Sequence, residues 1–125
     1  MPVIQIRALP QQPEPDIPQL LTRLCLAVAE SIGVPDDYVS ATWQTIAAGR
    51  YAVGGDTAMT QPRASHPLMV DVTAYETDDP EKIRRLLQTV GHFLEQALHL
   101  PGNVFILFHR PRSGEVYDGG EVVGI

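Results

Sequence analysis

Apolar residues recur every three or four positions in two segments of the chain, which is the spacing of one face of an α-helix. The first segment covers about residues 16–32, and its apolar positions are Ile17, Leu20, Leu21, Leu24, Val28 and Ile32. The second covers about residues 80–98, and its apolar positions are Ile83, Leu86, Leu87, Val90, Phe93, Leu94 and Ala97. An aspartate and a proline stand at the start of each segment, and a glycine and a proline follow its end, as is typical of helix termini. The pattern predicts two amphipathic helices.

Short apolar and β-branched runs lie before and after each predicted helix. They cover residues 3–9, 38–46, 68–75 and 104–109. Runs of this length and composition are typical of β-strands. Each half of the chain therefore has the order strand, helix, strand, which favours a parallel strand pair with a helical crossover.

The two halves match one another at a nearly constant offset. The opening Met1-Pro2 aligns with His66-Pro67 at an offset of 65, and residues 34–39 align with residues 100–105 at an offset of 66. A Gly-Gly pair then closes each half, at positions 54–55 and 119–120. We interpret the chain as one domain, residues 1–125, formed by an internal duplication. Repeat one covers about 1–55, a polar linker that includes Ser65 covers about 56–65, and repeat two covers about 66–125; His66 is expected to be a linker residue.

Composition and charge narrow the classes of function. Hydrophobic residues make up 44% and charged residues 19% of the chain, which is typical of globular proteins. Nine basic residues against fifteen acidic ones give a net charge of −6, which argues against nucleic acid as a partner. No apolar run is long enough to span a membrane and no signal pattern opens the chain, so we expect a cytoplasmic protein. One cysteine, Cys25, rules out an intrachain disulfide and a cysteine-rich zinc site, and no other ligands stand at metal spacing, so we expect no metal.

Three features together carry a resemblance. Met1-Pro2 opens directly into a strand, the strand–helix–strand unit is duplicated, and residues 47–55 form a glycine-rich segment. This segment is similar to the hairpin motif of 4-oxalocrotonate tautomerase, and the two-repeat length resembles macrophage migration inhibitory factor, so the chain resembles the tautomerase superfamily. The resemblance implies an α/β (α+β) fold with two tandem β-α-β repeats, in which a four-stranded mixed sheet carries two helices on one face. It also implies a homotrimer that forms a barrel.

The same resemblance implies an enzyme that needs no cofactor. Family members lose the initiating methionine, so Pro2 would become a secondary amine that acts as general base or acid on a small 2-keto or 2-hydroxy-dienoic acid. Burial in an apolar pocket would lower the pKa of that amine toward working pH, and Phe105 and Leu107 are expected to help form the pocket. Pro67 holds the matching place in repeat two, but its nitrogen is an amide and cannot be a base.

Two positions depart from the family pattern. Gln12 and Ser40 stand where 4-oxalocrotonate tautomerase has arginines, and residues 74–79 are acidic where the related decarboxylase has an arginine pair. Other cations could bind a carboxylate instead, because the arginine fork fits it in two-point fashion. Those candidates are Arg110, Arg112, His109 and Arg50. Alternatively, Arg110 and Arg112 form ion pairs with Glu115, Asp118 or Glu121 and bind no substrate. His109 would then be a packing residue.

Tyr51 and Tyr117, one in each glycine-rich hairpin, are candidates to donate a hydrogen bond to a developing enolate. Two further hypotheses stay open. In a hydratase, dehalogenase or decarboxylase, Pro2 would act as an acid, and Glu115 or Asp118 would activate a water molecule in the water-adding cases. Alternatively, the chain is a non-catalytic trimer that binds a small acid or a protein partner.

Overall fold

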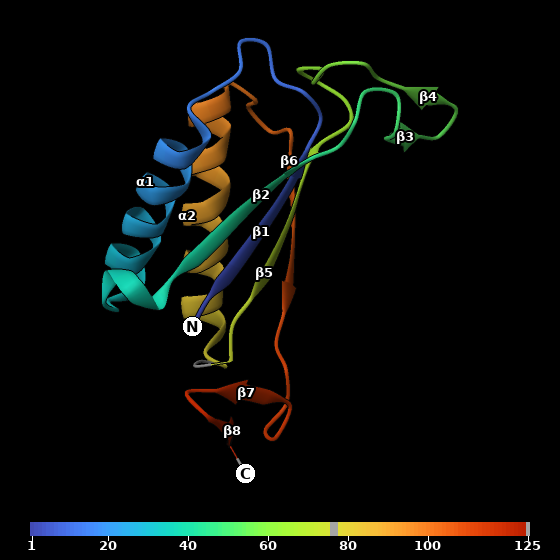
Figure 1. The fold of residues 1–125 in the computed structure, drawn as a ribbon. Helices are drawn as coiled ribbons and strands as arrows, with labels where there is room; N and C mark the ends of the chain where they lie inside the picture. Colours follow the sequence, from blue (N-terminus) through green and yellow to red (C-terminus); the bar gives the residue numbers. More distant parts are fainter. Residues whose placement is uncertain (76–77, 125) are drawn as a thin grey trace.

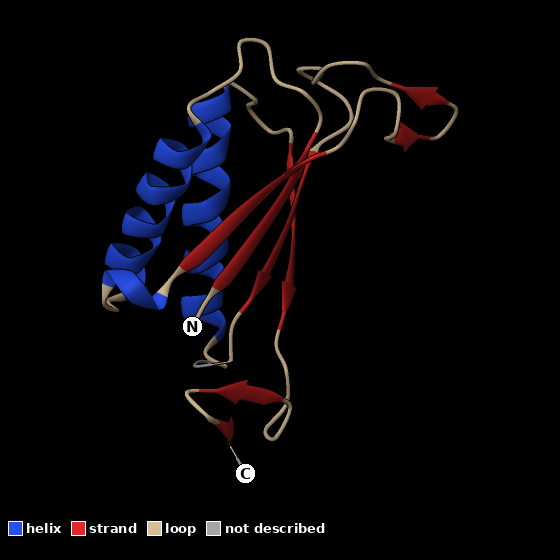
Figure 2. Cartoon of the chain, in the orientation of Figure 1, coloured by secondary structure: helices blue, strands red, loops and turns tan. Residues whose placement is uncertain are grey.

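Two helices cover one face of a four-stranded sheet in the computed structural model, which describes residues 1–75 and 78–124 (Figure 1). Repeat one consists of β1 (Val3–Ala8), α1 (Ile17–Ile32), the 3-10 turn η1 (Asp36–Tyr38), β2 (Ser40–Thr45), β3 (Ala52–Val53) and β4 (Asp56–Thr57). Repeat two consists of β5 (Leu68–Thr73), α2 (Pro80–Leu98), β6 (Val104–His109), β7 (Val116–Asp118) and β8 (Glu121–Val123). Figure 2 shows the two layers and the small hairpins β3–β4 and β7–β8 at opposite ends of the sheet.

The strand order of the sheet is β2-β1-β5-β6. Strands β1 and β2 are parallel, as are β5 and β6, so each predicted parallel pair with a helical crossover is confirmed. The two repeats meet along the antiparallel pair β1 and β5, in which Val3 lies opposite Thr73. The start of β1 therefore lies beside the end of β5, which brings the N-terminus next to the segment that leads into α2.

The helix ends follow from the predicted capping residues. The Asp16 carboxylate accepts a hydrogen bond from the backbone of Gln19 at 3.1 Å, and the Asp79 carboxylate accepts one from the backbone of Glu81 at 3.0 Å. Each bond satisfies a backbone N–H that the first helical turn leaves without a partner. Gly33 ends α1 with φ 71°, a left-handed conformation that glycine adopts at little cost.

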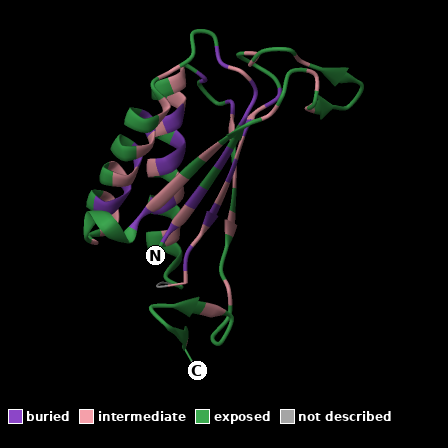
Figure 3. Cartoon of the chain, viewed as in Figure 1, coloured by how far each residue is buried: buried purple, intermediate pink, exposed green. Residues whose placement is uncertain are grey.

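The core lies between the helices and the sheet. Alternate residues of β1 and β5 point toward the helices and are almost fully buried, and Figure 3 shows buried positions gathered where the two layers meet. The strands contribute Ile4, Ile6, Val70 and Val72, and the helices contribute Leu24, Val28, Leu86, Val90 and Leu94. Burying each such side chain contributes about 1.5–3 kcal/mol. In the part of the chain that the structure describes, the opposite face of the sheet carries no helix.

Three local expectations are corrected. The predicted strand 38–46 begins with η1, and its strand part is β2; the predicted strand 68–75 ends at Thr73. His66 is no linker residue but is buried, with its Nε2 3.0 Å from the carbonyl oxygen of Asp56 and its ring edge-on to Tyr51. A polar ring can be buried here because both ring nitrogens have hydrogen-bond partners. Within the described residues, no helix is long and apolar enough to cross a membrane.

Candidate functional site

Pro2 is buried at the very start of β1. Its carbonyl oxygen accepts a hydrogen bond from the backbone of Ser40 at 3.1 Å, which ties it to the first residue of β2. On its other side lies the end of β5, because β1 and β5 are antiparallel. Both neighbours are fixed by sheet register, so the position of Pro2 does not depend on a loop.

A small cavity of about 120 Å³ lies against Pro2. Most of its lining is apolar, and the polar groups are one phenol and one ammonium. The lining residues are Pro2, Ile32, Val34, Tyr38, Ala74, Lys82 and Leu86. They come from the end of α1, from η1, from the residue after β5 and from the first turns of α2. A mostly apolar lining with two polar groups is the composition usual for a small-molecule site.

Two opposing influences act on the amine at this end of the chain. Burial lowers the pKa of the Met1 amine, since desolvation disfavours its charged form, and the negative charge of Asp118 acts in the opposite direction. Burial is the larger influence. An amine held here is therefore shifted toward its neutral form, while a carboxylate from β7 limits that shift.

Tyr75 connects the C-terminal hairpin to this end of the sheet. Its hydroxyl donates a hydrogen bond to Asp118 at 3.2 Å. Burial raises the pKa of the Tyr75 phenol, and the hydrogen bond to Asp118 and the charge of Asp118 raise it further, with Tyr38 contributing as well. Tyr38, Tyr75 and Asp118 thus lie near one another, and Tyr75 keeps its proton as a donor.

Two of the sequence-predicted residues lie at the other end of the sheet. Arg50 and Tyr51 lead into the β3–β4 hairpin, far from the N-terminus of the same chain (Figure 1). The Tyr51 hydroxyl donates to the carbonyl oxygen of Pro67 at 2.9 Å. Burial raises the pKa of this phenol, and the charge of Arg7 acts against that. Tyr51 therefore stabilises the start of β5 and does not line the Pro2 cavity of its own chain.

The residues predicted on and after β6 are also placed away from the cavity of their own chain. Phe105 and Leu107 are about half exposed on the helix-free face of the sheet. Arg110 lines a shallow hollow along the flank of α2 together with Phe108 and Arg84.

The remaining candidates lie in or near the C-terminal hairpin. The backbone N–H of Arg112 donates to the Glu115 carboxylate at 2.7 Å, and Tyr117 on β7 is strongly exposed. The Glu76 and Thr77 positions of the acidic segment 74–79 lie outside the described residues.

His109 is exposed and bonded to a carboxylate, so the alternative in which it is a packing residue is wrong. Its Nε2 lies 2.8 Å from Asp71 Oδ1, and the other Asp71 oxygen accepts from Arg7 at 3.0 Å. The three residues form a chain across β6, β5 and β1 on the helix-free face. The hydrogen bond to His109 and the charges of Arg7 and His109 lower the pKa of Asp71, against a smaller opposing effect of burial.

Three residues near Pro2 were not predicted from the sequence: Tyr38, Tyr75 and Lys82. Tyr38 lies two residues before β2, the strand that pairs with β1, so the parallel register offered a signal for it. Tyr75 and Lys82 come near Pro2 only because β5 runs antiparallel to β1, and no local pattern indicates that order.

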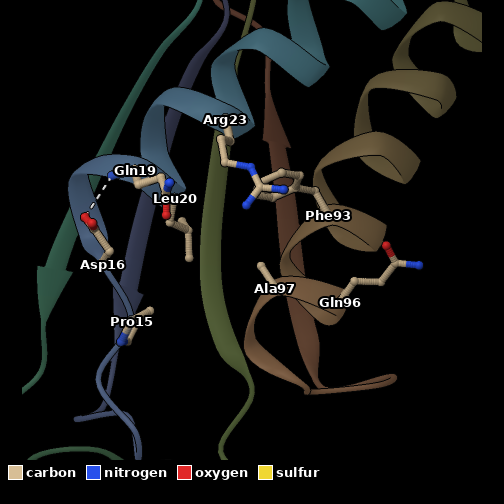
Figure 4. Close-up of a pocket in the computed structure, with 8 residues that line it drawn as sticks. All are labelled: Pro15, Asp16, Gln19, Leu20, Arg23, Phe93, Gln96 and Ala97. Carbon is tan, nitrogen blue, oxygen red and sulfur yellow. Dashed lines mark hydrogen bonds between the residues drawn. The ribbon is translucent and has the colours of Figure 1, made fainter.

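A second hollow, of about 350 Å³, lies at the ends of the two helices that are farther from Pro2. It is lined by the start of α1 and the end of α2, and Figure 4 shows Arg23 extending toward Phe93 across it. The Asp16 carboxylate on its rim is already engaged as the cap of α1. None of the groups around the N-terminus takes part in this hollow.

Comparisons with known proteins agree with this arrangement of elements. No protein-family model and no curated protein matches the chain. Solved structures do match. The structure of Pt0534 inactivated by 2-oxo-3-pentynoate aligns with a TM-score of 0.80 at 20% identity, over 98% of this chain and 95% of that one. Native fused 4-OT aligns with a TM-score of 0.80 at 18% identity, over 96% and 94%. These are tautomerase superfamily structures.

The chain has the two-repeat tautomerase fold. A macrophage migration inhibitory factor homologue from Prochlorococcus marinus shares it, with a TM-score of 0.74 at 23% identity over 98% of this chain and 99% of that one. The resemblance inferred from Met1-Pro2 and the duplicated β-α-β unit is thereby confirmed for the fold, including the four-stranded mixed sheet with two helices.

Proposed function

We propose that this protein is a cytoplasmic tautomerase that needs no cofactor and interconverts the enol and keto forms of a small 2-oxo acid. The observation that carries the proposal is the burial of Pro2 against a mostly apolar cavity that also holds a phenol and an ammonium group. Similarity of fold to fused 4-OT supports it.

The proposed mechanism begins with removal of Met1, which converts the Pro2 nitrogen from an amide to a secondary amine. Burial favours the neutral amine, which can accept a proton. The amine takes the proton from the enol hydroxyl, the carbon–carbon double bond electrons capture a proton from the resulting ammonium, and the oxygen becomes the keto oxygen. Tyr38, which lines the cavity, would donate a hydrogen bond to that oxygen as charge develops on it. The proline ring fixes the base in space, so little freedom is lost on reaching the reactive geometry.

We also propose a homotrimer. The solved structures of fused 4-OT include a symmetric trimer, which aligns with this chain at a TM-score of 0.79 and 18% identity. Strands β2 and β6 are the outer strands of the sheet and offer unpaired edges. In such an assembly, residues that lie away from Pro2 in their own chain can reach a neighbouring cavity, and this is the proposed route to substrate for Arg50, Tyr51, Phe105, Leu107, His109, Arg110, Arg112 and Tyr117.

Ketonisation of phenylenolpyruvate and of 2-hydroxymuconate, followed by ultraviolet absorbance, tests the proposal. Pro2→Ala should lower the rate by about a hundredfold or more, the usual effect of losing a general base. Pro67→Ala is the matched control, because Pro67 opens β5 as Pro2 opens β1 but has an amide nitrogen. Intact-protein mass should show that wild type, Pro2→Ala and Pro67→Ala all lack Met1.

A second function is favoured by one observation, the effect of the Asp118 charge on the amine of Met1, which raises its pKa. A carboxylate there stabilises the ammonium form, which would make Pro2 an acid, and the carboxylate could activate water for addition to an unsaturated acid. Release of a hydrated product from 2-oxo-3-pentynoate, with loss of that product in Asp118→Asn, would favour this hydratase over the tautomerase.

A further inference from the structure

Lys82 is the cationic side chain of the Pro2 cavity. It stands in the first turn of α2, two positions after Pro80, and Asp79 caps that helix. The partial positive charge of a helix N-terminus adds to the charge of the ammonium, so this wall favours an anion. Within residues 1–75 and 78–124, no ion pair engages Lys82.

The other walls that this chain supplies to the cavity offer nothing to a second negative charge. Ile32, Val34, Ala74 and Leu86 are apolar, and a carboxylate buried against them without a partner would lose its hydration at a large cost. The arginine closest in sequence to Lys82 on the outer helix surface, Arg84, points to a separate hollow and is paired with Glu81 at 3.6 Å.

The surroundings of the cavity are acidic. Asp118 acts on the N-terminal amine from one side, and Asp78, Asp79 and Glu81 flank Lys82 along the chain. The whole chain has a net charge of −6. Against the groups that this chain alone supplies, a dianionic substrate would therefore face repulsion from several carboxylates, whereas a monoanion finds the one cation it needs in Lys82. An arginine from a neighbouring copy that reached the second carboxylate would reverse this preference, and the comparison of monoacid with diacid distinguishes the two cases.

We propose that Lys82 binds the carboxylate of the substrate and makes the enzyme specific for 2-oxo acids and enols with a single carboxylate, against those with two. This inference rests on the proposed function, since it assigns the substrate class of the same cavity. The apolar walls receive the uncharged remainder of the substrate, and Tyr38 faces its 2-oxygen.

Steady-state kinetics on phenylenolpyruvate, which has one carboxylate, and 2-hydroxymuconate, which has two, test the inference. Wild type should favour the monoacid in kcat/KM by about tenfold or more, the size expected for one unfavourable charge contact. Lys82→Gln should raise KM for the monoacid by about tenfold to a hundredfold and change kcat less, since the lost contact is made equally in ground state and transition state. Lys82→Arg should restore most of the affinity.

Arg84→Gln is the matched control, because it removes an exposed positive charge two residues after Lys82 on the same helix. It should keep the wild-type KM. Lys82 is itself exposed, so its replacement should leave the circular dichroism spectrum and the melting temperature unchanged.

Calorimetric titration with phenylpyruvate and with 2-oxoadipate supplies a readout that needs no turnover. Tighter binding of the monoacid, weakened in Lys82→Gln, is the expected result. Preference for the diacid, or a Lys82→Gln variant with unchanged KM and affinity, would overturn the inference and leave the role of Pro2 standing. Turnover that survives Pro2→Ala would instead overturn the proposed function, while the titration would still decide the role of Lys82.

Discussion

At the scale of single residues, two influences act on the amine of Met1, the residue before Pro2. Burial lowers the pKa of that amine, and the negative charge of Asp118 acts in the opposite direction. In the proposed enzyme, which has lost Met1, we expect the same two influences on the Pro2 amine, and their balance would decide whether Pro2 is better suited as a base or as an acid. In the tautomerase account the neutral form is the active one, so activity is present above the pKa of the amine and lost below it.

Asp118→Asn removes the charge that stabilises the ammonium form. The pKa of the Pro2 amine should therefore fall, and the acidic limb of the kcat/KM profile should move to lower pH. Asp56→Asn in the distant β3–β4 hairpin is the control and should leave the limb in place. The profile is measured with phenylenolpyruvate between about pH 4 and pH 9, the range in which shifted amines titrate. A limb that moves to higher pH would show that another group controls it.

Asp71→Asn tests the chain of polar contacts on the helix-free face. Asp71 bridges His109 and Arg7, and its lowered pKa means that the folded state stabilises its charged form. That stabilisation is present above the pKa of an unfolded aspartate and is lost as pH falls through the lower folded value. The three side chains are partly exposed, so we expect Asp71→Asn to lower the free energy of unfolding by only about 0.5–1 kcal/mol at pH 7. Urea unfolding at fixed protein concentration should show this difference shrinking near pH 3.

At the scale of elements, the helices are what the sequence predicts best. Their apolar spacing and their caps are local signals, and α2 has the predicted bounds. The order of the strands in the sheet is not local, because β1 pairs with β5 across more than 60 residues of chain. That pairing brings Tyr75 and Lys82 near Pro2, which explains why the sequence indicated Pro2 as a candidate but gave no signal for these two neighbours.

The left-handed backbone of Gly33, which ends α1, can be tested by substitution. Gly33 has φ 71°, and a Cβ atom added to it would meet no other group within 4 Å, so an alanine there causes no clash and only strains the backbone. Gly33→Ala should destabilise the protein by about 1 kcal/mol. Gly55→Ala, at a position with equal space and no left-handed backbone, should change stability much less. Equal melting temperatures for the two variants would contradict this origin of the helix end.

At the scale of the whole molecule, β2 and β6 are the outer strands of the sheet, and among residues 1–75 and 78–124 no helix covers the face opposite α1 and α2. Phe105 and Leu107 are half exposed on that face, beside the His109–Asp71–Arg7 contacts. A face that combines apolar and paired charged groups is suited to contact between copies of the chain.

Light scattering on the purified protein tests the assembly. A homotrimer of this chain of 13.7 kDa has a mass of about 41 kDa. A mass that stays at that of one chain over a tenfold range of protein concentration would rule out the trimer, and with it the route by which Arg110, Arg112 and Tyr117 reach a neighbouring cavity.

The central claim is that the amine of Pro2 transfers the proton, and one comparison tests it most directly. The rate of phenylenolpyruvate ketonisation is measured for wild type and Pro2→Ala, after intact mass has shown that both lack Met1. The account predicts that the variant loses about a hundredfold or more of kcat/KM while keeping its fold and assembly. A variant that ketonises phenylenolpyruvate at the wild-type rate would contradict the account.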